Sequence, residues 1–288
     1  MQNGQEQKTE KNRMRQLEGI ALKLRELCEG LGLSRQVTEQ VLEHDTCLEY
    51  EKMEESCRKL YSRETWEEGV RELQAACAED PDGFRILTVM MHCLLDTYDR
   101  YQEKGISDEI FWSTMKFLTR FIDAEEKSTG APAFRWAWWF PRQLSMQEFR
   151  VGHYEYEMME EDGVKKISLH IPSDAVLKEG NIEIIRGFLK QYYPEYQNAQ
   201  IFCDSWLLAP ALQKLLPETS SILRFQKQFQ VLKNDEESQG FMDWVYGSRD
   251  LKYEDLPENT TLQRNMKKYL LSGGKIGWAL GVYRGEEQ

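Results

Sequence analysis

The sequence predicts an α+β protein: a helical N-terminal domain over residues 1–146 is followed by a mixed α/β domain over residues 147–288. Apolar residues recur at helical spacing through the first half, whereas strand-like and helix-like stretches alternate in the second half. The length of 288 residues exceeds that of an average single domain. A hydrophobic content of 41%, with eight Trp, excludes wholesale disorder and allows a sizeable core.

The first half is predicted to be helical almost throughout. Ser34 is the expected N-cap of an early helix. The stretch "FRILTVMMHCLL" is apolar nearly all round, which predicts the central buried helix of this half. A dense aromatic patch between Gly130 and Pro141 either lines a ligand pocket or packs a domain interface: Phe134, Trp136, Trp138, Trp139 and Phe140. The first helix is expected to carry an apolar stripe of Met14, Leu17, Ile20, Ala21, Leu24, Leu27, Cys28 and Leu31.

The second half changes its period at "EFRVGHYEYEMMEEDGVKKISLHIP". This stretch predicts two strands joined by a turn at Asp162–Gly163, because Asp-Gly is a strong hairpin signal. Helices and strands are then expected to alternate. The predicted order is helix "IEIIRGFLKQYY", strand "AQIFCDSWLL", helix "PALQKLL", strand "QFQVLK", helix "TTLQRNMKKYLL" and strand "KIGWALGVY".

Charge and cysteine usage narrow the classes of function. The formal net charge of -12 argues against a nucleic-acid-binding protein, since affinity for the phosphate backbone depends on Lys and Arg. Six Cys occur without a C-x-x-C pair, which predicts reduced thiols in a core. No basic and apolar leader and no apolar run of about 20 residues is present, so we expect a cytoplasmic protein without a membrane-spanning segment.

A polar face is expected on a strand spanning residues 149–157. Side chains alternate along a strand, so this pattern places His153, Glu155 and Glu157 together. They could act as a general-base cluster or lie on a solvated outer face. They could also bind a metal ion, but no recognisable set of further ligands follows, so we predict no metal site.

Three more residues have side chains that could take part in chemistry. His170 leaves the apolar face of its predicted strand and is either a functional or a packed histidine. Cys203 could be a nucleophile, but free Cys is more often a core residue. Ser205 follows Asp204 at the end of an apolar strand. The stretch "LLSGGKIG" lacks the pattern of a phosphate loop, so its glycines are expected to end a helix.

Three segments in order resemble a bacterial group of two-domain acyltransferases with a helical N-terminal domain and a GNAT-like C-terminal domain. They are "QEFRVGHYEYEM", "ISLHIPSDAVL" and "CDSWLLAPALQKLLPETSSILRFQKQFQV". The resemblance implies a central sheet that splays open between two strands, where acyl-CoA enters. It also predicts that the strands containing Leu169 and Cys203 are adjacent, parallel and diverging at their C-terminal ends.

The resemblance places the cofactor loop at "HIPSDAVLKEGN". In typical members this turn is Gly-rich, and its backbone N–H groups bind the CoA pyrophosphate. Here Gly180 is its only glycine, Pro172 has no N–H, Asp174 and Glu179 are acidic, and Lys178 is its only cation. The residues implied to contact the cofactor, acetyl-CoA or another acyl-CoA, are His170, Ile171, Pro172, Ser173, Lys178, Gly180 and Asn181.

The implied activity is acyl transfer from acyl-CoA to a small-molecule or peptide amine. Such a reaction needs a base for the amine, for which Glu155 and His170 are the candidates. It also needs an acid for the leaving thiolate, for which Ser205 or a nearby Tyr is the candidate. The alternative, favoured by the unusual loop, is a GNAT-fold module that binds a ligand or partner without catalysis. The acceptor and the oligomeric state stay open.

Overall fold

The computed structural model describes residues 19, 21–178 and 180–285. The chain forms two compact units, Met1–Phe149 and Arg150–Gln288, and the division falls inside the first strand. In the described residues, no helix is long and apolar enough to cross a membrane.

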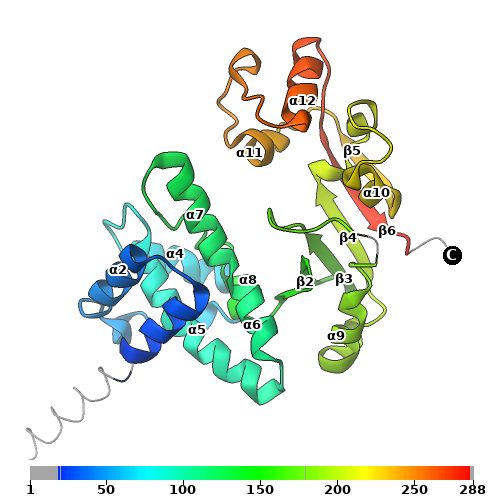
Figure 1. Cartoon of the computed structure of the whole chain (residues 1–288). Helices are drawn as coiled ribbons and strands as arrows, with labels where there is room; N and C mark the ends of the chain where they lie inside the picture. The colour runs from blue at the N-terminus through cyan, green and yellow to red at the C-terminus, as the bar shows by residue number, and fades with distance from the viewer. Residues whose placement is uncertain (1–18, 20, 179, 286–288) are drawn as a thin grey trace, which may run out of the picture. The chain divides into compact units, whose positions relative to one another are not determined.

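The first unit is helical, as predicted (Figure 1). Residues 21–31 form a helix whose Leu24, Leu27, Cys28 and Leu31 are buried. The predicted stripe residues Met14, Leu17 and Ile20 lie outside the described residues. The following helices are α2 (Arg35–Asp45), α3 (Glu54–Lys59), α4 (Trp66–Ala76), α5 (Phe84–Lys104), α6 (Asp108–Met115), α7 (Phe117–Thr129) and α8 (Pro141–Leu144), with a 3-10 turn η1 (Tyr50–Lys52).

Two predictions about these helices are confirmed. The Ser34 side chain accepts a hydrogen bond of 3.3 Å from the Val37 N–H, so it caps α2. Helix α5 has eleven buried residues and is the central helix of the unit. Its ends are set by two glycines with left-handed backbone, Gly83 at φ 77° and Gly105 at φ 72°.

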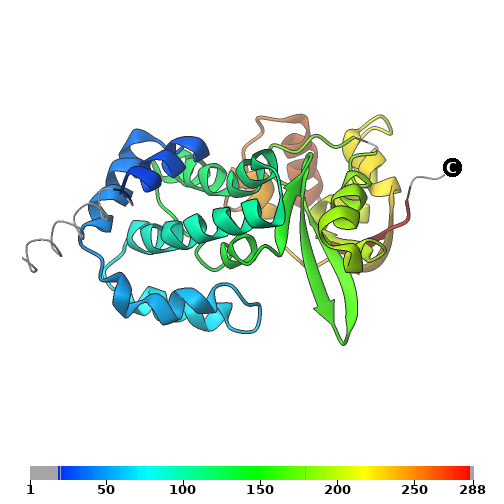
Figure 2. The same cartoon turned by 90° about the horizontal axis from the view of Figure 1, so that it is seen from below.

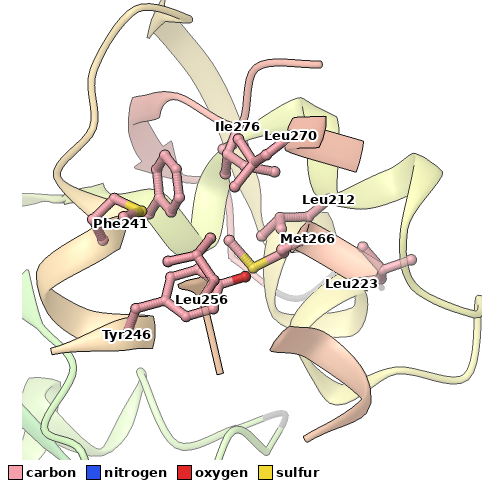
Figure 3. Packing of buried hydrophobic residues seen from close by; sticks show 10 residues of the cluster. Leu212, Leu223, Phe241, Tyr246, Leu256, Met266, Leu270 and Ile276 are labelled. Carbon is pink, nitrogen blue, oxygen red and sulfur yellow. The ribbon is translucent and has the colours of Figure 1, made fainter. Parts of the chain in front are cut away.

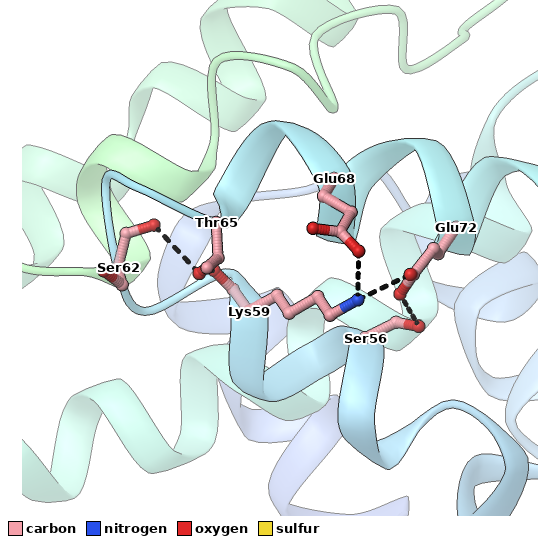
Figure 4. A network of polar contacts seen from close by, with 6 residues as sticks. All are labelled: Ser56, Lys59, Ser62, Thr65, Glu68 and Glu72. Atoms are coloured by element: carbon pink, nitrogen blue, oxygen red, sulfur yellow. Dashed lines mark hydrogen bonds and ion pairs between the residues drawn. The ribbon is translucent and has the colours of Figure 1, made fainter.

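A polar network fastens α3 to α4 (Figure 4). The Lys59 ammonium donates to Glu68 and Glu72 at 2.6 Å each, and the Ser56 hydroxyl donates to Glu72 at 2.7 Å. The side-chain hydroxyl of Thr65 reaches the backbone carbonyl of Lys59 at 2.9 Å. The lysine therefore bridges two carboxylates, and its stem crosses the gap between the helices.

The cysteine prediction is confirmed in part. The six thiols are free, and four of them are buried. Cys47 is exposed and Cys57 is half-buried, so these two do not belong to a core.

A six-stranded mixed sheet runs in the order β1-β2-β3-β4-β6-β5. Figures 1 and 2 show strands of this sheet from two directions. Strands β3 and β4 pair in parallel, whereas β2 with β3, β4 with β6, and β5 with β6 pair antiparallel. The strands are β1 (Glu148–Val151), β2 (Tyr154–Glu161), β3 (Val164–His170), β4 (Gln200–Ser205), β5 (Phe229–Asp235) and β6 (Trp278–Tyr283). The predicted fold class, helices followed by a mixed sheet with helices, is confirmed.

The hairpin turn at Asp162–Gly163 is confirmed, with φ values of 51° and 75°. The prediction of one strand over residues 149–157 is wrong. Gly152, with φ 66°, and His153 form a second turn that separates β1 from β2. Glycine allows this left-handed turn, and its presence is the local signal that the alternating pattern concealed.

Helices and 3-10 turns connect the strands of the second unit. The predicted strand "AQIFCDSWLL" ends at Ser205, because its last residues form the 3-10 turn η3 (Trp206–Leu208). The other elements are α9 (Ile184–Tyr192), η2 (Pro194–Tyr196), η4 (Pro210–Lys214), α10 (Ser221–Lys227), α11 (Phe241–Tyr246), η5 (Tyr253–Asp255) and α12 (Thr261–Leu271). Of these, α11 was not predicted. Gly273, at φ 85°, follows the end of α12, as predicted for the glycines of "LLSGGKIG".

The connections between β4 and β6 bury a core of their own (Figure 3). Met266 and Leu270 of α12 have 0% and 4% of their surface exposed. They pack in one cluster with Phe241 and Tyr246 of α11. Thr260 and Gln263 form a capping box that fixes the start of α12. This core fixes α12, which precedes β6 in the chain.

Replacing Met266 by Ala should lower the free energy of unfolding by about 2–5 kcal/mol, because it leaves a cavity in this core. The matched control is Leu271→Ala on the same helix, where the side chain is 50% exposed and the loss should stay below about 0.5 kcal/mol. Chemical denaturation of both variants measures the difference. Equal losses would contradict the assignment of Met266 to the core.

Candidate active site

The sheet opens between its two parallel strands. The ladder of β3 and β4 consists of Lys166↔Gln200, Ile167↔Ile201 and Ser168↔Phe202. Both strands continue beyond it, to His170 and to Ser205. There β3 pairs only with β2, and the last three residues of β4 pair only with β6. The predicted adjacent, parallel and diverging strands are therefore confirmed.

An imidazole and two buried carboxylates lie at the end of β3. Glu155 stands directly across from His170 in the β2–β3 ladder. His170 Nε2 lies 3.2 Å from Glu157 Oε2. The exposed fractions of Glu155 and Glu157 are 6% and 3%, and the side chain of His170 is 27% exposed. The structure thus brings together two predicted candidates, Glu155 and His170, and adds Glu157 as the partner of the imidazole.

The expected grouping of His153 with these carboxylates is wrong. His153 lies in the turn before β2, whereas Glu155 and Glu157 alternate along β2 itself. The reading of this face as a solvated outer surface is also wrong for both Glu residues, because they are buried. A buried carboxylate requires a hydrogen-bonding or charged partner, and His170 supplies one to Glu157.

The end of β4 presents polar groups at the opening. The Ser205 hydroxyl oxygen accepts a hydrogen bond of 3.1 Å from the Leu207 N–H and so caps η3. The preceding Asp204 accepts a hydrogen bond of 2.7 Å from the Trp278 indole. These contacts fix both side chains where β4 leaves β3.

The nucleophile hypothesis for Cys203 is not supported. Its side chain is fully buried, and this burial raises the pKa of the thiol well above the usual range. The neighbouring Asp204 raises the pKa further. Because the thiolate is the reactive species, Cys203 is best read as a core residue.

The predicted cofactor loop is held in place from the sheet. The Tyr156 hydroxyl lies 3.1 Å from the Asn181 carbonyl oxygen and 3.4 Å from that of Ile182. The Asn181 side-chain amide donates to the Val176 carbonyl at 2.9 Å. Gly180 adopts φ 81°, a left-handed conformation that suits glycine. Ile171 is half-buried, Pro172 is buried and Ser173 is exposed.

The acidic charge of the loop is partly compensated. Asp174 accepts two hydrogen bonds of 3.0 Å from Arg150 Nη1, and the Arg150 side chain is only 10% exposed. The loop therefore presents less negative charge than its sequence indicates, although Asp174 itself stays half-exposed.

A pocket of about 240 Å³ lies between this loop and α10. It is lined by Leu177, Lys178, Arg224, Phe225 and Gln228. Of the predicted cofactor residues only Lys178 belongs to this lining. The sequence reasoning missed Arg224 and Gln228. Arg224 and Gln228 are four positions apart in the segment that follows β4. This spacing of about one helical turn is the signal in the sequence that could have found them.

Replacing Tyr156 by Phe should release the loop while keeping the ring packed. We expect a loss of about 1 kcal/mol in the free energy of unfolding and faster amide exchange in residues 173–182. Hydrogen exchange with mass spectrometry measures the second effect. The control is Tyr246→Phe, whose hydroxyl donates to Gln263 O at 2.9 Å far along the chain. Tyr246→Phe should lower the free energy of unfolding by a similar amount without changing amide exchange in the loop. Unchanged amide exchange of the loop in Tyr156→Phe would refute the anchoring role of Tyr156.

Comparison with known families identifies both parts of the chain. A family model described as a GNAT-like C-terminal domain matches residues 92–283, more than half of the chain. A model described as an N-acyltransferase N-terminal domain matches residues 23–146. A search among curated proteins finds no match.

Solved structures share the fold at low sequence identity. An acyltransferase variant in complex with octanoyl-CoA is 17% identical, with a TM-score of 0.74 over 92% of this chain and 88% of that chain. An acyltransferase in complex with decanoyl-CoA and teicoplanin is 19% identical, with a TM-score of 0.72 over 90% of this chain and 86% of that chain. The two family matches establish that the chain belongs to the N-acyltransferases that join an N-acyltransferase N-terminal domain to a GNAT-like C-terminal domain.

Proposed function

We propose that the chain transfers an acyl group from acyl-CoA to an amine at the opening between β3 and β4. The observation that carries this proposal is the end of the β3–β4 ladder at Ser168 and Phe202, with His170 and its carboxylates at the rim. We assign the binding of the acyl donor to residues 147–288.

The opening suits the pantetheine arm of an acyl-CoA. Beyond Ser168 and Phe202 the two strands have no ladder with each other in the described residues. Backbone groups that face such a gap need other hydrogen-bond partners when water is excluded. The pantetheine arm carries two amide groups in an extended chain, so it can pair with strand edges as an added strand does.

His170 is proposed as the base. The attacking amine must lose a proton as its nitrogen forms a bond to the thioester carbon, and imidazole accepts protons near neutral pH. The buried Glu157 carboxylate orients the ring and stabilises the imidazolium that forms. Glu155 stands directly across the β2–β3 ladder from His170, on the same face of the sheet.

Ser205 is proposed as a donor to the leaving sulfur. The C–S bond breaks as the tetrahedral intermediate collapses, and the electron pair stays on the CoA thiolate. Since a free thiol has a pKa of about 8.5, this thiolate needs a hydrogen bond more than a strong acid. The Leu207 N–H donates to Ser205 Oγ, which favours donation of the hydroxyl proton toward the opening.

An acyl chain longer than acetyl is favoured by the solved neighbours. They were crystallised with octanoyl-CoA and decanoyl-CoA, and one of them also with teicoplanin. We propose that this chain likewise uses a medium-chain acyl-CoA. The acceptor is proposed to be an amine. Because one neighbour was crystallised with teicoplanin, this compound belongs among the first acceptors to be tested.

The first experiment combines binding and turnover. Acetyl-, octanoyl- and decanoyl-CoA are titrated by calorimetry, and each is then incubated with a panel of amines. Released CoA thiol and the mass of the acylated product are measured. We expect saturable binding and release of one thiol per product. Binding without turnover on any amine would favour a non-catalytic ligand-binding module, and no binding at all would refute the proposal.

The base assignment predicts that His170→Asn lowers kcat by about a hundredfold or more while leaving the dissociation constant of acyl-CoA nearly unchanged. The matched control is His153→Asn in the β1–β2 turn, which should keep full activity. Glu157→Gln keeps the imidazole of His170 but removes the carboxylate charge that stabilises its protonated form. The kcat of Glu157→Gln should therefore fall less than that of His170→Asn. If His170→Asn and His153→Asn are equally active across the pH range, the base lies elsewhere.

A further inference from the structure

The loop after β3 lacks the glycines whose backbone N–H groups bind pyrophosphate in related folds, so the phosphates of CoA need another partner. The pocket beside this loop offers one. Arg224 and Phe225 of α10 line it together with Gln228, the residue that caps the C-terminus of this helix, and the loop contributes Leu177 and Lys178. Gln228 follows Arg224 by four positions, which is about one helical turn.

The two cations of the pocket are available to a ligand. Both Lys178 and Arg224 are exposed. Within the described residues, neither side chain forms an ion pair with a carboxylate. In a chain with a formal charge of -12, two exposed cations at one pocket form a local positive site.

A buried amide also faces the pocket without a protein partner. Gln228 is only 8% exposed, and its Oε1 has no hydrogen-bond partner in the described part of the chain. A buried polar side chain without a partner is costly, and such groups occur where a ligand supplies the missing contact. Because the amide can present either its oxygen or its NH₂ group, it can serve a phosphate oxygen.

A tyrosine from the sheet lies beneath the same loop and helix. The Tyr154 ring packs against Phe225 with centroids 6.0 Å apart, and its buried hydroxyl lies beside the Lys178 backbone and the Asn181 side chain. Burial raises the pKa of Tyr154 to about 12. The hydroxyl therefore keeps its proton at neutral pH and remains a donor. Two cations and an amide line the volume of about 240 Å³, and the Tyr154 ring packs beneath it against Phe225.

We propose that this pocket binds the phosphate groups of CoA through the side chains of Lys178, Arg224 and Gln228, in place of the backbone N–H groups of a Gly-rich loop. The inference rests on the proposed acyl-CoA-dependent function and adds the residues that select a phosphorylated donor. A guanidinium on α10 and an ammonium on the loop can contact a diphosphate from two sides.

The test compares three ligands: CoA, dephospho-CoA, which lacks the 3′-phosphate, and pantetheine, which lacks all phosphates together with the adenosine. Dissociation constants are measured by calorimetry for the wild-type chain and for Arg224→Met and Lys178→Met. Each substitution should weaken CoA binding by about 10- to 100-fold, as expected for a lost charge-assisted contact. Neither substitution should change the weak binding of pantetheine.

Matched controls separate this site from general charge effects. Lys227→Met removes an exposed cation from the same helix without touching the pocket, so CoA binding should be unchanged. Gln228→Glu should weaken CoA binding more than Gln228→Met does, because it places a carboxylate beside the phosphates. Gln230→Glu adds the same charge at an exposed position on β5 and should have little effect. Thermal midpoints without ligand verify that each variant is folded.

The outcomes distinguish this inference from the proposed function. If the wild-type chain binds neither acyl-CoA nor pantetheine, the proposed function fails and this inference with it. If the wild-type chain binds CoA and Arg224→Met and Lys178→Met bind it equally well, the proposed function stands and the inference is wrong. A third outcome would support the inference and narrow it: dephospho-CoA binds as tightly as CoA, pantetheine binds weakly, and both substitutions weaken the binding of dephospho-CoA. The pocket then binds the diphosphate and not the 3′-phosphate.

Discussion

The early end of the β3–β4 ladder is the constraint on which the rest of the structure depends. Three residue pairs join these strands, and then each strand follows its other neighbour: β3 stays paired with β2, and β4 with β6. Because both strands are held from outside, they separate without losing their own geometry. The opening therefore lies inside a rigid sheet and not in a loop, and His170 and Ser205 stand at its two sides on strand ends.

Because side chains alternate along β2, its tyrosines and its carboxylates lie on opposite faces of the sheet. Tyr154 and Tyr156 point to the face where the loop after β3 and α10 lie, as their contacts with Asn181 and Phe225 show. Glu155 and Glu157 point to the opposite face, together with His170. A donor that enters the opening would have its phosphates on the tyrosine face and its thioester near the carboxylates. One strand with strict alternation thus places two tyrosines on one face of the sheet and two carboxylates on the other.

The sequence predicted the parts of this arrangement that depend on local pattern. Helix α5, the Asp162–Gly163 turn and the Ser34 cap follow from periodicity and turn chemistry, and the structure has all three. The Gly152–His153 turn was missed because the residues around it continue the alternating pattern of a single strand. The burial of Glu157 and the position of Arg224 at the pocket depend on which elements pack together in three dimensions. A local sequence pattern does not contain this information.

The loop after β3 shows how packing changes the charge that composition predicts. Its acidic Asp174 is bound to Arg150, its Asn181 amide is bound to Val176 O, and two of its carbonyl groups face the Tyr156 hydroxyl. The loop's polar groups are thus largely committed to holding its own shape. A loop held in this way can position Lys178, but it cannot wrap an anion with successive N–H groups as a flexible glycine loop does. In the proposed site, recognition of phosphate comes from long side chains, whose charge is screened by salt. Binding of the donor by this family member should accordingly be more sensitive to ionic strength than binding by a backbone nest, since fixed dipoles carry no net charge to be screened.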